Sequence, residues 1–534
     1  MRLLLLRRIM EPTRRLKWKN GIDYWYEETA YYDKEKKQIR HHSKYLGRNI
    51  DGVPVRMRSA PEEVKAKVKE GGLPSARSTF DYGSILTLQT IMAELGLDRH
   101  LLDILSPSEV AMASAMAFNR IIRPTAMRNV AAWYEGTSLT LESPKINLSS
   151  QRISEFLGRL GDSDIPDRFM ARLLEETGTK STLVYDITSL SSYSQLINLL
   201  EYGYNRDGDS LPQINLSLIL DKEKGIPVMY DIYPGSISDV STLSNTLQKI
   251  KAHGIENYIA VMDRGFFSLS NLEELLNSQI SFIMAAKLQL KDLKLLMTEE
   301  EKDIDDVKYL QKFGEDAIFI KPITYPIGSN TVKGYLYYDP ELEHSEKRTL
   351  WRRLYDIRKD LIKTRLNKGS NAVSVFKDKA QGFMNYFEWQ VVDDRFEVAI
   401  KQNAVAQRMN KMGKYILFYS GDFDGMTCLT LYRERDEIER SFKALKNEID
   451  ILPLNTHGDE TARGFIFIAF LSLIIRTRLM NRMREAKLLD KYSVELLLLQ
   501  LEKLRKIKLA DGQVINTEMT KKQREILEAL KIRA

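Results

Sequence analysis

The order of apolar segments between residues 181 and 285 constrains the fold of this 534-residue chain more than any other feature. A β-rich run, STLVYDITSL, comes first, and the runs QINLSLIL and IPVMYDIYPG follow, joined as a hairpin by a turn that contains glycine. A helical segment at 239–252, an apolar strand at 257–263, a helix at 269–278 and the strand SFIMAA complete the series. This β-β-β-α-β-α-β order predicts an α/β protein with a mixed sheet and flanking helices.

Two aspartates follow apolar runs of this predicted sheet. Asp186 comes after Leu183 to Tyr185, and Asp263 comes after Ile259 to Met262 and before Gly265, which allows a sharp exit from the strand. A carboxylate at the end of a buried strand is costly unless it is paired, hydrogen-bonded or bound to a metal. A single aspartate of this kind is often structural, whereas two in one sheet are a stronger indication of function.

A third carboxylate lies on a strongly periodic segment from Tyr432 to Leu452. At about 100° per residue, one predicted helical stripe is apolar and forms the core face: Ile438, Phe442, Leu445 and Ile449. A second stripe beside it carries a phenol, a guanidinium, a carboxylate and an ammonium group: Tyr432, Arg435, Glu439 and Lys446. A salt-bridged surface helix explains the pattern equally well, because Arg435 and Glu439 are four residues apart.

The spacing of the second stripe resembles a known family signature. Tyr432, Arg435, Glu439 and Lys446 match the Y-(2)-R-(3)-E-(6)-K pattern of bacterial and archaeal insertion-sequence transposases, of the insertion-sequence-four type with a DDE triad. Asp186 in DITS resembles the first aspartate motif of that family, and Asp263 in MDRGFF resembles the second. Pro234-Gly235-Ser236 is also similar, so the resemblance covers roughly residues 180–480.

The resemblance implies a ribonuclease-H-like catalytic core with two divalent ions, Mg²⁺ or Mn²⁺, held by Asp186, Asp263 and Glu439. Carboxylate oxygens suit such ions, and two ions about 4 Å apart can activate a nucleophile and stabilise a leaving oxygen. Asp186 would bridge both ions. The implied DNA contacts are Tyr432, Arg435, Lys446 and Arg264.

The implied activity is transposition of double-stranded DNA. The protein would bind the terminal inverted repeats of an insertion sequence, cleave the DNA with water and join the freed 3′-OH ends to target DNA. A homodimer is expected by analogy, since joining two ends needs two active sites. Two alternatives stay open: a catalytically silent DNA-binding descendant of a transposase, and a ribonuclease-H-fold nuclease that only cleaves.

Asp263 and Glu439 are 176 positions apart, which predicts an α+β insertion at 290–414 that folds as its own unit. Its long helix near 340–366 carries several cations, among them Arg352 and Arg353, which are candidate DNA contacts. A solvated charged helix is the alternative. Trp351 is interpreted as a core residue that anchors this helix, with base stacking as the second hypothesis.

The charge is uneven along the chain, which carries +7 overall. Residues 1–76 hold 18 Lys and Arg against 10 Asp and Glu, and residues 471–534 hold 15 against 8, so the centre is acidic. Basic ends suit a polyanion partner, although solvated termini would look the same. Strands are predicted at 22–46, and helices at 85–95, 107–121 and 149–160, either as a helix-turn-helix DNA reader or as a packing domain.

Six regions are therefore expected. They are a basic β-rich segment (1–76), a helical DNA-end-binding domain (77–175), the first part of the catalytic core (176–289), the insertion (290–414), the second part of the core with the Glu439 helix (415–485) and a basic helical region (486–534).

The single cysteine, Cys428, excludes a disulfide within the chain and a cysteine-based zinc site. The longest apolar run, Phe465 to Ile475, is shorter than the about 20 residues of a spanning helix, so a buried helix and no membrane partner are expected. A signal peptide is not expected from the first ten residues. The expected location is the cytoplasm, in association with the nucleoid.

Overall fold

The computed structural model describes residues 12–19, 22–33, 38–56, 76–176, 181–203, 211–237, 239–252, 258–367, 369–454, 456 and 458–533. The chain divides into two compact units. The first comprises Met1–Thr79 and Ile507–Asn516, and the second comprises Phe80–Lys506 and Thr517–Ala534.

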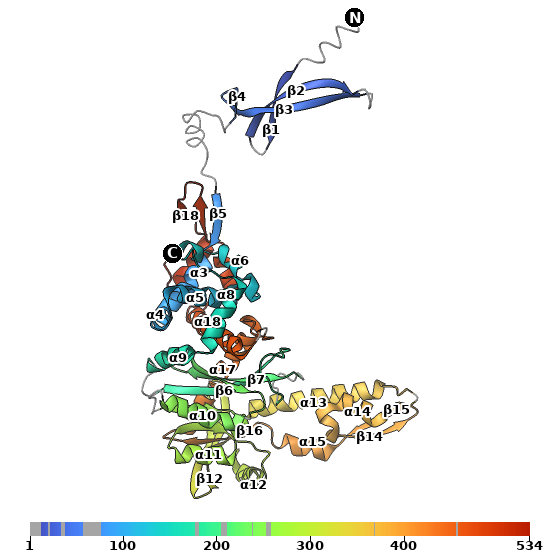
Figure 1. Ribbon diagram of the computed structural model, residues 1–534. Helices are drawn as coiled ribbons and strands as arrows, with labels where there is room; N and C mark the ends of the chain where they lie inside the picture. The colour runs from blue at the N-terminus through green and yellow to red at the C-terminus, as the bar shows by residue number, and fades with distance from the viewer. Residues whose placement is uncertain are drawn as a thin grey trace. The chain divides into compact units, whose positions relative to one another are not determined.

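The first unit is built from strands (Figure 1). An antiparallel sheet of order β1-β2-β3-β4 contains Thr13–Lys19, Ile22–Asp33, Gln38–Ile50 and Val53–Val55, which confirms the strands predicted at 22–46. On one face, Lys17 pairs with Glu28 and lies over the ring of Tyr26. A smaller sheet of order β18-β17-β5 contains Val514–Asn516, Arg505–Leu509 and Ala76–Asp81, and the chain passes into the second unit within β17 and β5.

A nine-stranded mixed sheet is the centre of the second unit (Figure 1). Five of its strands lie in the order β8-β7-β6-β9-β10, namely Ile226–Pro234, Gln213–Asp221, Ser181–Ser191, Tyr258–Met262 and Ser281–Ala285. The strands β6, β7 and β8 are antiparallel, whereas β9 is parallel to β6 and β10 is parallel to β9. Together with α10 (Asp239–Ala252) and α11 (Leu269–Asn277), this order confirms the predicted mixed α/β sheet and is consistent with a ribonuclease-H-like core.

The sheet continues beyond β10 through four antiparallel strands. They are β16 (Lys414–Ser420), β13 (Asn330–Tyr338), β12 (Asp316–Ile327) and β11 (Leu310–Phe313). Three of these belong to the region predicted as a separate insertion, 290–414, so that boundary differs from the structure. The physical reason is that β10 and β16 have backbone groups that need partners at both edges, and alternation in a sequence does not indicate which strand will supply them.

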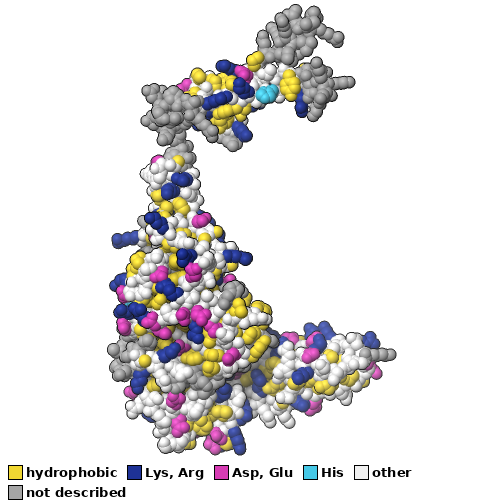
Figure 2. Space-filling model, in the orientation of Figure 1, with side chains coloured by type: hydrophobic (Ala, Val, Ile, Leu, Met, Phe, Trp, Pro, Cys, Tyr) yellow, Lys and Arg dark blue, Asp and Glu magenta, His cyan; other side chains and the backbone are white. Residues whose placement is uncertain are grey.

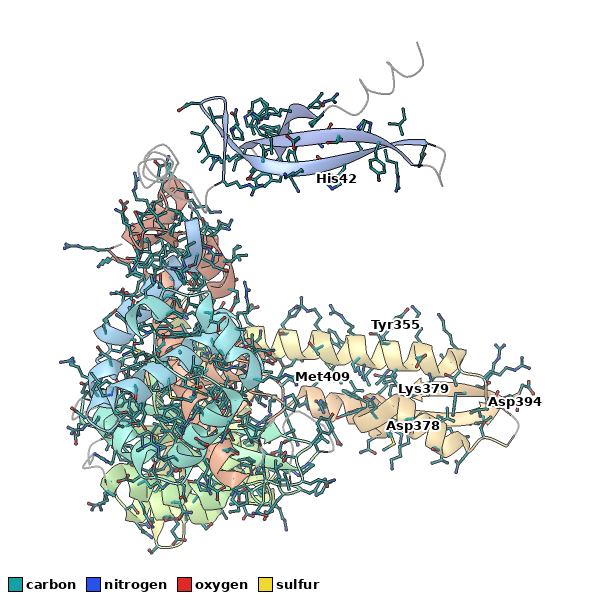
Figure 3. All side chains as sticks on the ribbon, turned by 45° about the horizontal axis from the view of Figure 1, so that its top comes forward. His42, Tyr355, Asp378, Lys379, Asp394 and Met409 are labelled. Atoms are coloured by element: carbon teal, nitrogen blue, oxygen red, sulfur yellow. The ribbon has the colours of Figure 1, made fainter. Side chains whose placement is uncertain are left out.

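A separate hydrophobic core begins only at residue 340. It is enclosed by α13 (Pro340–Lys363), α14 (Ala372–Ala380), β14 (Phe387–Val392), β15 (Arg395–Ile400) and α15 (Gln402–Met409). These elements, here called the arm, lie together in Figures 1 and 3. In Figure 3, Tyr355 points away from α14, while Lys379 of α14 pairs with Asp360 of α13 at 2.8 Å. The insertion that folds around its own core is therefore the arm.

The long basic helix α13 buries one stripe at regular spacing, formed by Leu350, Leu354, Ile357 and Leu361. Trp351 lies beside this stripe and is 50% exposed, so the interpretation of Trp351 as a core anchor is wrong. One helical step of about 100° turns it out of the buried face. Arg352 is exposed, and Arg353 donates a hydrogen bond to Gln381 Oε1 at 3.0 Å.

A helical region surrounds one long helix, α18 (Asp459–Glu485). The other helices of the region are α3 (Gly83–Glu94), α4 (Leu97–Leu102), α5 (Pro107–Ile122), α6 (Val130–Glu135), α7 (Leu139–Glu142), α8 (Ser150–Gly161), α9 (Ile165–Glu175), α19 (Val494–Leu501) and α20 (Lys521–Ala529). Of these, α3, α5, α8 and α19 contact α18 directly. The predicted helices at 107–121 and 149–160 are confirmed. Because α18 also packs on β8, these helices and the central sheet share one hydrophobic core.

Among the described residues, α18 is the one helix long and apolar enough to cross a membrane by length and composition. However, 83% of its most apolar window is buried inside the protein, against α5, α8 and β8. This burial confirms the predicted buried helix at Phe465 to Ile475. On the face seen in Figure 2, Lys and Arg side chains are interspersed with Asp and Glu over the second unit.

The contact between α8 and α18 depends on Gly464. A Cβ atom at this position would lie 2.0 Å from the carbonyl oxygen of Leu157, which is a backbone atom of α8. We expect Gly464→Ala to force the helices apart and to lower the free energy of unfolding by about 1–3 kcal/mol or more. A lower Tm in a thermal melt would show this effect.

Gly158, also in α8, is the matched control. A Cβ atom there would lie 3.8 Å from the Thr461 methyl group, an ordinary contact. Gly158→Ala should leave the Tm unchanged or raise it, because alanine is the better helix former. Equal Tm values for the two variants would contradict the tight packing at Gly464.

Candidate active site

The two predicted aspartates occupy matching positions on adjacent strands. In the parallel pair β6 and β9, Val184 lies opposite Val261. Asp186 and Asp263 each come two residues later, so both side chains leave the sheet on the same face and at the same level. The structure thus brings together two carboxylates that are 77 positions apart in the sequence.

The two aspartates differ in their local surroundings. The strand β6 continues past Asp186 to Ser191, so Asp186 lies within the strand, where the Ile187 N–H donates to its Oδ1 at 2.8 Å. The strand β9 ends at Met262, and Asp263 caps a short 3-10 helix, accepting a hydrogen bond from the Arg264 N–H at 2.6 Å. Both side chains are partly buried.

The segment predicted as one helix at 432–452 has three parts. These are α16 (Gly425–Arg433), α17 (Asp436–Lys443) and a π-helical turn, Ala444–Glu448. The predicted core stripe is confirmed, because Ile438, Phe442, Leu445 and Ile449 are all buried. The π turn inserts an extra residue into the helical repeat, so Lys446 no longer has the phase that a regular helix predicts.

Arg435 links the second aspartate to the glutamate. It directly precedes α17, and its guanidinium contacts Asp263 Oδ2 at 2.9 Å and Glu439 Oε1 at 2.8 Å. The Tyr432 hydroxyl donates to Asp263 Oδ1 at 3.4 Å, and the Arg435 guanidinium lies 5.5 Å from the Tyr432 ring centre. The predicted surface salt bridge between Arg435 and Glu439 therefore exists, and it extends to the sheet.

The electrostatics of Arg435 connect all three carboxylates. Burial lowers the pKa of Arg435, but the Tyr432 phenol and three carboxylates outweigh burial and raise that pKa above its ordinary value. The carboxylates are Asp263, Asp186 and Glu439, in order of decreasing effect. Burial also raises the pKa of Tyr432, which keeps its hydroxyl protonated as a hydrogen-bond donor.

Comparison with known proteins decides the family. A sequence model of the transposase DDE domain matches residues 177–475, which is more than half of the chain. The chain belongs to this DDE transposase family. This range contains Asp186, Asp263 and Glu439, together with the arm and most of α18.

The other comparisons add less. None of the curated proteins compared matches the chain. A synaptic complex of piggyBac transposase with hairpin DNA is 9% identical over 79% of this chain and 77% of that chain, with a TM-score of 0.38. A strand transfer complex of the Drosophila P element transposase is 11% identical over 73% and 87%, with a TM-score of 0.17. Neither score supports an argument about the fold.

A cleft of about 900 Å³ opens beside the carboxylates of the DDE domain. Asp263, Glu439, Arg264, Tyr432 and Arg435 line it, whereas Asp186 is not among its lining residues. Lys446, Arg352 and Arg353 also lie outside the lining, so the structure does not gather them with the other predicted DNA contacts. The opposite wall comes from α12 (Lys291–Glu300), the base of α13 and the start of β16.

Sequence reasoning missed four cations that line the cleft: Lys294, Lys411, Lys414 and Arg433. Two of them form ion pairs within the protein: Arg433 with Asp339 at 2.7 Å, and Lys414 with Glu301 at 3.1 Å. Lys294 and Lys411 are exposed and form no ion pair with the described residues. No periodic signal marked these lysines, since they come from separate elements within the predicted insertion.

Proposed function

We propose that this protein is a DNA transposase of the insertion-sequence-four type, which cleaves at terminal inverted repeats and joins the 3′-OH ends to target DNA. The observation that carries the proposal is the shared level of Asp186 and Asp263 on adjacent parallel strands. Arg435 connects Asp263 to Glu439 and so brings the third carboxylate to the same place. The family membership of residues 177–475 supports the same activity.

The side chains of Asp186, Asp263 and Glu439 are of the right chemical type to bind two divalent ions, because carboxylate oxygens are the hard ligands that Mg²⁺ and Mn²⁺ prefer. The described residues contain no group of three or more acidic, histidine or cysteine side chains close enough to hold a metal, so the three carboxylates would have to move closer together to hold the ions. Arg435 supplies the positive charge in that space. When bound, Mg²⁺ or Mn²⁺ would activate the attacking oxygen and stabilise the leaving oxygen.

The surrounding residues would hold the DNA. Arg435, once released from the carboxylates, would bind a phosphate near the cleaved bond, because a guanidinium matches phosphate geometry. The protonated Tyr432 hydroxyl would donate to a phosphate oxygen, and Arg264 would bind another phosphate at the cleft entrance. Lys294 and Lys411 extend this path along the opposite wall, and the exposed Trp351 of the arm suits stacking on an unpaired base.

Cleavage of a duplex that carries the terminal inverted repeats tests the proposal. Purified full-length protein with Mg²⁺ should nick or cut at the repeat end and then join the 3′-OH to a second duplex. Cleavage without joining would favour a nuclease that only cuts. Binding of the repeat without cleavage would favour a catalytically silent descendant of a transposase. The presence of all three carboxylates argues against that alternative.

Joining two ends needs two active sites, so we further propose a homodimer in the complex with both ends, acting in the cytoplasm on nucleoid DNA. The helical region at 77–175 and the basic first unit are proposed to contact the repeats. Because α3 to α9 share a core with α18, a fragment that contains only residues 1–175 would lack the packing partner of these helices. Tests of end binding should use the whole chain.

The proposed phosphate contacts predict a change in salt dependence. Arg435→Gln and Arg264→Gln should each weaken DNA binding for all sequences and reduce the magnitude of the slope of log K against log[salt] by about one unit, because both residues line the cleft. Lys443→Gln is the control, since Lys443 is exposed on α17 and lies outside the cleft lining. Fluorescence anisotropy titrations over a salt series would measure the slopes, and a changed base preference with an unchanged slope would contradict these roles.

A further inference from the structure

A second cleft, of about 620 Å³, lies where α5 and α8 meet the loop that follows the Glu439 helix. Here it is called the loop cleft. It is lined by the end of α5, the segment that leads into a 3-10 helix (Met127–Asn129), the start of α8, one residue of α18, and Asp450, Leu452, Pro453 and Thr456. None of the residues assigned above to catalysis lines the loop cleft.

Arg120 is a buried cation at the inner wall of the loop cleft, and it is only 4% exposed. Its guanidinium donates to backbone carbonyls, at 3.4 Å to Ile449, at 3.1 Å to Asp450 and also to Thr125. No carboxylate contacts the guanidinium within the described part of the chain. Burial lowers the pKa of Arg120 and outweighs the charge of Asp450, which acts to raise that pKa. An anion in the cleft would further stabilise this buried charge.

Two buried polar atoms of the loop cleft lack hydrogen-bond partners among the described residues. They are Nε of Arg120 and Oγ1 of Thr456, and Thr456 is 9% exposed. Buried donors without partners are uncommon in folded proteins. Both atoms belong to lining residues but are themselves shielded from solvent, so they leave uncompensated polar groups behind the wall of the cleft.

Two further features of the loop cleft favour a negative charge. Arg128 is exposed, lines the cleft and forms no ion pair with the described residues. Ser150 is the first residue of the 12-residue helix α8 and also lines the cleft, and helix N-termini attract anions. The one carboxylate in the lining belongs to Asp450, which is exposed. The lining of the loop cleft thus carries two arginines and a helix N-terminus, against a single carboxylate.

The loop cleft is connected to the active site through the backbone. The Ser192 hydroxyl, just after the strand of Asp186, donates to the Leu454 carbonyl at 2.7 Å, and the Ser194 hydroxyl donates to the Thr456 carbonyl at 3.2 Å. Asp450 is eleven positions after Glu439, along α17 and the π turn. At no more than about 1.5 Å per residue, this segment advances roughly 16 Å at most. At about 3.4 Å per step, roughly five base pairs of duplex span that distance.

We propose that the loop cleft binds a phosphate group of the same DNA that is cleaved at Asp186, Asp263 and Glu439. This inference rests on the proposed function. Arg128 and the N-terminus of α8 contact the phosphate, and Arg120 provides the fixed positive charge behind it. The contact sets the distance between the cleaved bond and the rest of the repeat.

A phosphate scan on the full-length protein tests the loop cleft. Terminal-repeat duplexes with one neutral methylphosphonate each are titrated with wild type, Arg128→Gln and Arg168→Gln, in buffer without divalent ions. Arg168 is the matched control, because it is exposed on α9 and lies outside the loop cleft. One methylphosphonate, roughly five base pairs from the cleaved bond, should weaken binding by wild type and Arg168→Gln but not by Arg128→Gln.

Arg128→Gln should also reduce the magnitude of the slope of log K against log[salt] by about one unit. The Tm of this variant should equal that of wild type. The proposal is overturned if Arg128→Gln responds to every methylphosphonate as wild type does. It is also overturned if inorganic phosphate raises the Tm of wild type but not of Arg128→Gln while both bind DNA alike, because the ligand is then a free anion. A wild-type protein that does not cleave the repeat refutes the proposed function instead, and the binding scan still decides the loop cleft.

Discussion

Asp186→Ala, Asp263→Ala and Glu439→Gln should each reduce the cleavage of terminal-repeat DNA at least about a thousandfold. Each tenfold loss corresponds to about 1.4 kcal/mol of transition-state stabilisation, and a displaced catalytic metal withdraws several kcal/mol. Binding of the repeat should remain largely intact, because these carboxylates are assigned to the metal ions and not to DNA phosphates. Cleavage rates with Mg²⁺ and gel shifts without it separate the two effects.

Glu437→Gln is the matched control for this series. Glu437 lies on α17 close to Glu439 but pairs with Arg440 and Arg484, away from the aspartates. Its loss should leave cleavage within a few-fold of wild type. Near wild-type cleavage by any one of the three carboxylate variants would remove that residue from the catalytic assignment.

Arg435→Met should raise the affinity of the DNA-free protein for Mn²⁺ by about thirtyfold. The guanidinium contacts two of the three proposed ligands, Asp263 at 2.9 Å and Glu439 at 2.8 Å, and so competes with a cation for the same oxygens. An unfavourable interaction of about 2 kcal/mol is enough for this change, and unit charges about 4 Å apart at an effective dielectric constant of 20 reach about 4 kcal/mol.

Paramagnetic resonance of free Mn²⁺ measures this affinity without any need for cleavage. Arg440→Met is the control, because Arg440 lies on the same helix and pairs with Glu437 instead of the proposed ligands. Arg440→Met should bind Mn²⁺ as wild type does. Equal Mn²⁺ affinity of wild type and Arg435→Met would show that the Arg435 guanidinium does not compete with the metal for the carboxylate oxygens.

Local patterns predicted the elements of the catalytic sheet in their correct order. The apolar runs around Asp186 and Asp263 became β6 and β9, and the intervening helix became α10. The alternation of buried and exposed positions is set by the backbone repeat of a strand or a helix, so it can be read without knowing the neighbours. Local patterns do not identify which strands pair with one another. The predicted start of the insertion at residue 290 was therefore wrong, because β12 and β13 pair into the central sheet.

The site was predicted in part. Its core stripe on α17 and the pair of Arg435 and Glu439 followed from helical periodicity, and both are present. Lys446 was placed on the same stripe, but the π turn changes its phase and it does not line the cleft. Lys294 and Lys411 were missed because only the folded positions of α12 and of the turn between α15 and β16 bring them to the cleft beside the carboxylates.

The sequence by itself determined which residues could act, namely two aspartates after apolar runs and a spaced set of polar residues beside a buried helical stripe. These features depend on neighbours a few positions away, where chain connectivity limits the geometry. The tertiary structure alone decided that Asp186 and Asp263 stand at one level, that Arg435 joins Asp263 to Glu439, and that Arg120 is buried beside an open cleft. Such contacts join residues 77 to 330 positions apart, and only the packing of the shared core determines which of many possible pairs forms.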